Sequence, residues 1–241
     1  MQVPVKITPD RIRDSIVQVY FESDIPYLPL IGYFHSYLLS MDYDFASGEN
    51  NTNLNKIEVD LSFLNHLFVS NKHGIKINIH PNGSIIFNCI DNYIGWESYS
   101  SEIYKVLSKL MEVGIIKTVT RIGVRFTSEF PNINLLDNIN FAVNYDLKNK
   151  SLNAGNFNIE LTEDNYRIIL NLVSNLRINN QVIQNDIASI SLIDVDVIKD
   201  NLLLLNFNEV KETINQIHIK QKETFFSLLK EDFLSSLNPE Y

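Results

Sequence analysis

The C-terminal end of the chain, residues 208–239, keeps helical spacing over a longer stretch than any other part of the sequence. Apolar side chains recur there at intervals of three and four, so they share one side of a helix, while lysines and glutamines lie on the other. The positions on this mostly apolar side are Val210, Ile214, Ile217, Gln221, Phe225 and Leu228, and Gln221 is its polar member. Asn208 is a suitable N-cap, and Asn238-Pro239 is a suitable end. We expect one helix of roughly 40 Å, with its weakest point near Thr224.

Shorter apolar or alternating runs fill most of the remaining chain and are typical of β-strands. Asn82-Gly83 lies between two such runs and predicts a hairpin turn, because Asn and Gly tolerate the positive φ angles of tight turns. Residues 33–39 and 98–113 have helical spacing, and Gly114 is expected to end the second helix. The predicted strands cover residues 15–22, 56–68, 74–79, 84–90, 116–128, 141–147, 157–162, 166–174, 189–196 and 202–204.

The order of these elements predicts an α+β fold with two similar halves, each an antiparallel sheet followed by a helix packed across it. We place the halves at residues 1–135 and 136–241, because residues 131–138 form a connector. The polar segment 48–55 is a candidate loop insertion. The halves share a layout without sequence identity, so an ancient duplication is a hypothesis about topology.

Composition narrows the class of protein. Of the 241 residues, 45% are hydrophobic and 20% are charged, which is typical of a globular protein. A formal net charge of −9 argues against a protein that binds nucleic acid by neutralising phosphates. No apolar run is long enough to span a membrane, and the first ten residues lack the apolar core of a signal peptide. We therefore expect a cytoplasmic protein without a membrane partner.

The single cysteine, Cys89, excludes an internal disulfide and a cysteine-based metal site. It lies within the apolar run 85–90, so we expect a buried, inert thiol rather than a nucleophile.

Two pairs of charged residues could carry chemistry. Asp194 and Asp196 are two apart on a predicted strand, so their carboxylates share a face and could hold Mg²⁺. Arg121 and Arg125 also share a face of their strand and could bind an anion. The alternative is an ion pair between the two strands, in which the arginines neutralise the aspartates. We consider this structural role the more frequent one.

The histidines and aromatic residues give weaker signals. The five histidines show no metal-ligand spacing, and His218 stands out because it lies beside the apolar stripe of the C-terminal helix. Tyr93, Trp96 and Tyr99 form an aromatic cluster that could be an interaction surface or could cover the edge of a sheet. The sequence contains no phosphate-binding glycine loop and no nucleophile elbow, so we expect no cofactor and favour a non-enzymatic role.

The C-terminal helix also carries a resemblance. Ile217-His218, Phe225-Phe226 and the closing Leu237-Asn238-Pro239 resemble the C-terminal signature of a sporadically distributed bacterial protein family of uncharacterised function. Residues 16–22, 121–126 and 193–196 resemble strands of the same family in the same order. The family usually has Thr-Glu-Glu where this chain has residues 230–232, Lys-Glu-Asp, so a shared role for that turn does not follow.

The resemblance implies an accessory role, because a scattered distribution is typical of phage-defence and toxin–antitoxin genes. We therefore expect a non-catalytic binding or regulatory subunit that has a protein partner or forms a homo-oligomer. The alternative hypothesis is a metal-dependent hydrolase or nucleic-acid-processing enzyme centred on Asp194 and Asp196.

Overall fold

The computed structural model describes residues 3–46, 66–70, 72–90, 93–142, 154–177 and 189–241. Within these ranges the fold is mixed α+β, as expected, with a large antiparallel sheet. The helices are α1 (Tyr27–Ser40), α2 (Trp96–Glu112), α3 (Leu135–Asn138), α4 (Phe207–Leu228) and α5 (Glu231–Ser236). The strands are β1 (Lys6–Ile7), β2 (Ile12–Glu22), β3 (Tyr43–Ala46), β4 (His66–Ser70), β5 (Lys76–His80), β6 (Ser84–Ile90), β7 (Thr118–Pro131), β8 (Gly155–Glu163), β9 (Tyr166–Arg177), β10 (Ser189–Lys199) and β11 (Pro239–Glu240).

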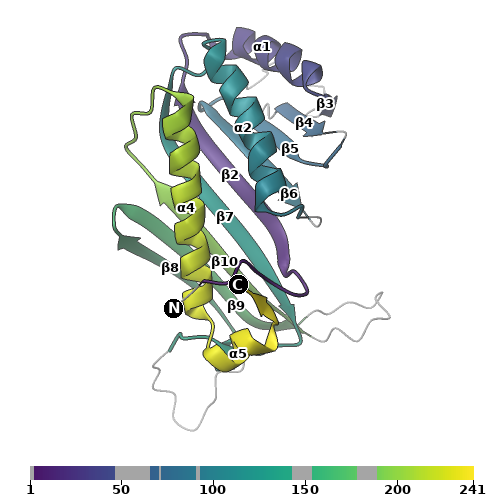
Figure 1. The fold of residues 1–241 in the computed structure, drawn as a ribbon, viewed down its shortest axis with the longest axis vertical. Coiled ribbons are helices and arrows are strands. Elements are labelled where there is room, and N and C mark those ends of the chain that lie inside the picture. The colour runs from purple at the N-terminus through teal and green to yellow at the C-terminus, as the bar shows by residue number, and fades with distance from the viewer. Residues whose placement is uncertain (1–2, 47–65, 71, 91–92, 143–153, 178–188) are drawn as a thin grey trace, which may run out of the picture. The chain divides into compact units, whose positions relative to one another are not determined.

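Nine of the described strands follow one another in the order β3-β4-β5-β6-β2-β7-β10-β9-β8 (Figure 1). Strands β1 and β11 form a separate small antiparallel pair. Neighbouring strands are antiparallel where their register is known: Ser84 of β6 lies opposite Tyr20 of β2, and Asn158 of β8 lies opposite Asn171 of β9. Residues 56–65 of the predicted strand 56–68, residues 143–147 of the predicted strand 141–147, and the polar loop 48–55 lie outside the described residues.

The chain divides into two compact units. The first, called here the terminal unit, contains residues 1–13, 125–197 and 217–241. The second, called the middle unit, contains residues 14–124 and 198–216. The predicted boundary between residues 135 and 136 lies within α3 of the terminal unit, and the division of the chain into halves at that point stays a prediction.

In the middle unit, α2 lies along the sheet face formed by β2 and β6 (Figure 1). Its inward stripe includes Ile103, Val106, Leu107 and Leu110, all fully buried as the helical spacing predicts. The helix ends at Glu112, and Gly114 follows with a φ of 74°, which only glycine adopts without strain.

The predicted hairpin at Asn82-Gly83 is confirmed. Strands β5 and β6 pair with His80 opposite Ser84, and Gly83 has a φ of 75°. A Cβ atom at Gly83 would lie 2.8 Å from the carbonyl oxygen of Phe21, so the turn requires glycine for space as well as for conformation.

Helix α1 is longer than the predicted residues 33–39. The prediction treated Pro29 as a break, but the helix begins at Tyr27, which places Pro29 in the first turn. A proline is tolerated there because the first amides of a helix have no partner within the helix. Leu30, Phe34 and Leu38 form its buried stripe.

The predicted C-terminal helix is two helices. Helix α4 ends at Leu228 and α5 begins at Glu231, so the break falls after Thr224, at residues 229–230. Leu229 forms a β-bridge with Ile139, and the Lys230 amide donates a hydrogen bond to the Asn138 carbonyl at 3.0 Å. Residues 138–140 therefore form hydrogen bonds with backbone groups of residues 228–230 that would otherwise have continued the helix.

The helix start is also different from the prediction. The side-chain oxygen of Asn206 accepts a hydrogen bond from the Glu209 amide at 3.1 Å, and Glu209 accepts one from the Leu205 amide at 3.2 Å. The arrangement resembles a capping box in which Glu209 reaches the amide before the N-cap, so Asn206 is the N-cap rather than Asn208. Residues 202–204, predicted as a strand, form only a bridge between Leu204 and Val119.

Candidate functional site

A row of polar side chains crosses the sheet of the terminal unit. Strand β7 alternates as predicted, with Phe126 buried on one face and Arg125 on the other. Arg125 donates two hydrogen bonds to Asp194 of β10, from Nε to Oδ1 at 2.8 Å and from Nη2 to Oδ2 at 2.6 Å. The side chain of Asp194 is 7% exposed and that of Arg125 is 43% exposed. The ion pair expected between the two strands is therefore present.

The row continues toward β8. Asn171 of β9 donates to Asp194 Oδ2 at 3.1 Å, and Asn158 of β8 donates to Asn171 Oδ1 at 2.6 Å. The hydroxyl of Thr127 lies 3.3 Å from Asp194 Oδ1 and donates to it. Both oxygens of the Asp194 carboxylate thus accept from protein donors, which is how a buried carboxylate is stabilised in its charged form.

The other members of the predicted charged set are separate from this row. Arg121 belongs to the middle unit, where its Nε lies 3.1 Å from Asp200 Oδ1. Its guanidinium carbon lies 4.7 Å from the centre of the Tyr20 ring, a cation–π contact. Asp196 lies on the same strand face as Asp194 and is partly exposed. In the described ranges, no three side chains of His, Cys, Asp or Glu gather as metal ligands.

His218 lies on α4 in the terminal unit, with its ring centre 5.8 Å from that of Phe126. Burial, and to a smaller extent the nearby charge of Lys222, lowers the pKa of His218 to about 3. The imidazole is therefore neutral at physiological pH, and its surroundings are those of a packed side chain.

The predicted aromatic cluster is partly in the core of the middle unit. Tyr99 is fully buried, and its hydroxyl donates to the Phe87 carbonyl at 2.8 Å and lies 3.1 Å from the Ser15 carbonyl. The half-buried rings of Tyr93 and Trp96 pack against it with edge contacts. Tyr99 thus belongs to the interior and contributes no exposed area. Cys89 is also buried, as predicted, and burial raises the pKa of its thiol.

The outer side of α1 is the surface that sequence reasoning missed. The helix, YLPLIGYFHSYLLS, contains no charged residue in its 14 positions. Leu28 is 58% exposed, Tyr33 49% and Leu39 45%, and the neighbouring Phe45 of β3 is 40% exposed. We call these four residues the α1 surface. The ring of His35, also exposed, lies 5.6 Å from that of Phe45 and joins the strand to the helix.

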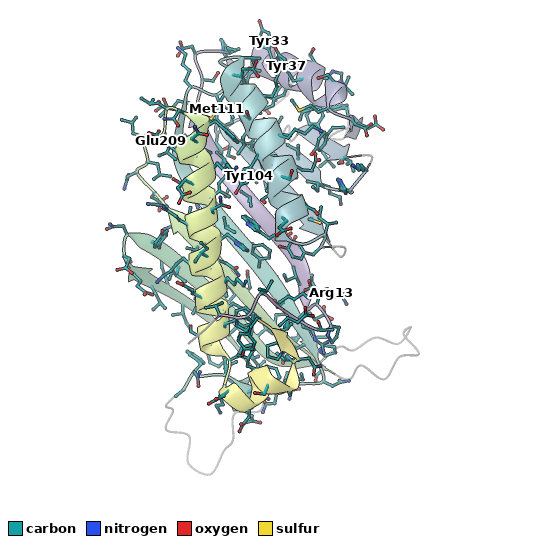
Figure 2. All side chains as sticks on the ribbon, viewed as in Figure 1. Arg13, Tyr33, Tyr37, Tyr104, Met111 and Glu209 are labelled. Carbon is teal, nitrogen blue, oxygen red and sulfur yellow. The ribbon has the colours of Figure 1, made fainter. Side chains whose placement is uncertain are left out.

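Tyr33 and Tyr37, marked in Figure 2, come from one flank of α1, four residues apart. Leu28, His35 and Leu39 lie on another flank, because seven and eleven residues complete whole helical turns. The stripe of Leu30, Phe34 and Leu38 is buried in the core. The absence of charge over residues 27–40 is visible in the sequence, but treating Pro29 as a break hid the length of the helix.

The middle unit also contains a polar contact between helices. The hydroxyl of Tyr104 on α2, marked in Figure 2, donates to Asn215 Oδ1 on α4 at 2.6 Å. Burial raises the pKa of Tyr104 to about 12, so its hydroxyl keeps its proton and remains a donor. The ammonium of Lys211 lies 5.4 Å from the centre of the same ring. The hydrogen bond and the cation–π contact of Tyr104 therefore join α2 to α4.

Comparison with known proteins gives no family. The chain matches no model of a protein family, and a search of curated proteins finds no similar one. Among the described helices, none combines the length and the apolar character that crossing a membrane requires.

Proposed function

We propose that this chain is a non-catalytic, cytoplasmic binding or regulatory subunit, and that the α1 surface is where it binds a partner protein. The observation that carries the proposal is the uncharged helix α1, whose outward residues Leu28, Tyr33 and Leu39 are each about half exposed. A helix on a protein surface normally presents polar and charged residues to water. Large apolar side chains exposed on such a helix are typical of an interface.

The chemistry of this surface favours an apolar partner. Interface centres are depleted in charged residues and enriched in aromatic ones, and α1 has the same composition, with Tyr33 and Tyr37 on one flank. Because α1 has no charged side chain, binding through it should depend little on salt concentration. A partner groove lined with leucine, methionine or aromatic side chains fits this requirement.

The test compares capture of the partner by the wild-type chain and by a variant of the α1 surface. We would use the tagged full chain and the double variant Leu28→Lys/Leu39→Lys, and identify the captured proteins by mass spectrometry. The matched control is Leu203→Lys, because Leu203 of the same unit is 73% exposed and lies outside α1. We expect a stoichiometric partner with the wild type and the control and its loss with the double variant.

The circular dichroism spectrum of each variant establishes that its fold is intact. Capture of the same partner by the folded double variant would reject the α1 surface as its binding site. Loss of binding above 0.5 M salt would reject the apolar mode of binding.

The resemblance to a sporadically distributed family supports placing this subunit in a phage-defence or toxin–antitoxin type of locus. In that setting, the double variant should lose the protective or neutralising effect of the locus in cells, while Leu203→Lys should keep it. Equal protection by both variants would contradict the proposal.

The alternative, a metal-dependent hydrolase or nucleic-acid-processing enzyme centred on Asp194 and Asp196, is the weaker proposal. A cation at Asp194 would have to displace the Arg125 guanidinium, which holds both carboxylate oxygens. An Asp194→Asn/Asp196→Asn variant that folds and loses the biological effect, while the α1 variant retains it, would reverse this order of preference.

We also propose that the chain contains two similar halves that arose by duplication. Strand order supports this: β2 neighbours β6 in one part of the chain, and β7 neighbours β10 in the other. In each case the first strand of the series neighbours the last, and a long helix follows, α2 or α4. This comparison places β7 at the start of the second half, whereas the predicted halves, 1–135 and 136–241, placed it in the first. An experimental structure in which β2, β4, β5, β6 and α2 fail to superimpose on β7, β8, β9, β10 and α4 would reject the duplication.

A further inference from the structure

Strand β8 is an edge of the sheet in the terminal unit, and in the described residues no strand lies on its outer side (Figure 1). Natural sheets usually protect an edge by making it short or by placing proline or lysine on it. The opposite edge, β3, follows this rule with four residues. Strand β8 has nine residues, GNFNIELTE, without a proline, lysine or arginine. It therefore presents a long backbone edge on which another strand can pair.

The two faces of β8 have different chemistry. Phe157, Ile159 and Leu161 lie on one face, and Leu161 is 46% exposed. Asn158 and Glu160 lie on the other. A strand that pairs with this edge must present apolar residues on the first face and polar residues on the second.

The polar row described above ends at this edge. Its hydrogen bonds run from Asp194 through Asn171 to the exposed Asn158, which donates one N–H to Asn171. An Asn amide carries two N–H donors and an oxygen acceptor. The partner that fits beside Asn158 therefore offers both a donor and an acceptor at the same level of the sheet.

We propose that β8 pairs antiparallel with β8 of a second copy of this chain, about a two-fold axis at Asn158. A second copy supplies the required group, because Asn158 then lies opposite its own equivalent and two amides can exchange N–H···O hydrogen bonds. With this axis, the apolar face of one strand continues the apolar face of the other, and the polar faces likewise lie on the same side. The opposed pairs are Asn158 with Asn158, Phe157 with Ile159, Asn156 with Glu160, and Gly155 with Leu161.

Charge argues against another register that also matches the faces, the one with its axis at Glu160. An axis at Glu160 would place two carboxylates directly opposite each other, which is destabilising. An axis at Asn158 places each Glu160 opposite the neutral amide of Asn156 and separates the two carboxylates by four positions along the strands. At Gly155, the space is filled by the ring of Phe157, since a Cβ there would lie 2.6 Å from the ring. Leu161 of the second copy would pack on that ring.

The first test is the mass of the full chain in solution as a function of concentration, by light scattering and sedimentation. A contact through one strand edge predicts reversible dimerisation, so the mass should rise with concentration. Asn158→Lys should abolish the dimer, because it sets two ammonium groups against each other at the axis. Ser227→Lys is the matched control, because Ser227 is an exposed position of α4 in the same unit, and this variant should dimerise as the wild type does.

The second test reads the register directly. The native Cys89 is 2% exposed, so an introduced surface cysteine is the reactive one under mild oxidation. Asn158→Cys should form a covalent dimer, since residues at the axis face each other at about 5 Å between Cα atoms. Glu160→Cys should not, because its equivalent lies about 13 Å away along the strands. A monomer at all concentrations, or equal crosslinking of the two variants, would overturn the proposal.

This inference uses a different surface from the α1 proposal and does not depend on it. The Leu28→Lys/Leu39→Lys variant should dimerise normally, and Asn158→Lys should still capture the partner. The two proposals can therefore fail separately.

Discussion

Arg125 and Asp194 are joined by a two-point hydrogen-bonded ion pair in which the acid is almost fully buried and the base is partly exposed. This asymmetry predicts unequal costs when one partner is removed. Arg125→Ala leaves a buried carboxylate without its counter-ion and should lower the free energy of unfolding by about 1–3 kcal/mol, after allowance for solvent screening of the exposed arginine. Asp194→Asn leaves an arginine that water can reach and should cost less.

Urea unfolding of the two variants measures this difference. The double variant Arg125→Met/Asp194→Leu should recover part of the stability lost in Arg125→Ala, because replacing both partners removes the unpaired charge. A larger cost for Asp194→Asn than for Arg125→Ala would show that the hydrogen bonds from Thr127 and Asn171 to Asp194 contribute more to stability than the ion pair does.

His218 should make the protein sensitive to acid. Its pKa is lowered to about 3 in the folded chain and is about 6.5 in an unfolded one. Below pH 6.5 the unfolded state therefore binds a proton that the folded state does not, so the free energy of unfolding falls as the pH drops toward 3. The loss is up to about 1.4 kcal/mol for each pH unit in that window.

The variant His218→Phe keeps a ring beside Phe126 but cannot titrate. Compared with it, the wild type should lose about 1.5 kcal/mol more between pH 6.5 and 5 in urea unfolding. Lys222→Gln serves as a partial control, since it removes only the smaller cause of the shift. Parallel pH profiles for wild type and His218→Phe would contradict the assignment.

The N-cap of α4 gives a prediction that distinguishes the residue expected from the sequence, Asn208, from the residue that caps the helix in the structure, Asn206. Asn206→Ala removes the acceptor of the Glu209 amide and should destabilise the protein by about 1 kcal/mol. Asn208→Ala replaces an exposed residue inside the first turn and should have little effect. Thermal unfolding of the two variants decides between them, and equal shifts in Tm would argue against Asn206 as the N-cap.

Tyr99 should matter through its hydroxyl as well as its ring. Tyr99→Phe removes the donor to the Phe87 carbonyl inside the middle unit and should cost about 1–2 kcal/mol. Tyr241→Phe is the control for the same chemical change at a side chain that is 62% exposed, and it should leave stability unchanged. Similar denaturation midpoints for the two variants would mean that the Tyr99 hydroxyl is not needed by the fold.

Local chemistry accounts for the elements that the sequence determined by itself. The alternation of β7 placed Arg121 and Arg125 on one face, because successive side chains of a strand point in opposite directions. Gly83 and Gly114 marked a turn and a helix end through the φ angles that they tolerate. The apolar run around Cys89 predicted its burial. Each of these features depends on neighbours within a few residues.

The tertiary structure decided the features that depend on distant partners. The break at residues 229–230 exists because the segment after α3 offers backbone groups to Leu229 and Lys230, and no local signal shows this. Asp194 pairs with Arg125, which is 69 residues away in the sequence. The sequence alone was compatible with both a metal site and an ion pair at Asp194. The exposure of α1 and of the β8 edge likewise depends on which surfaces the rest of the chain covers. Burial and pairing are properties of the folded chain, so spacing along the sequence can propose them but cannot choose among them.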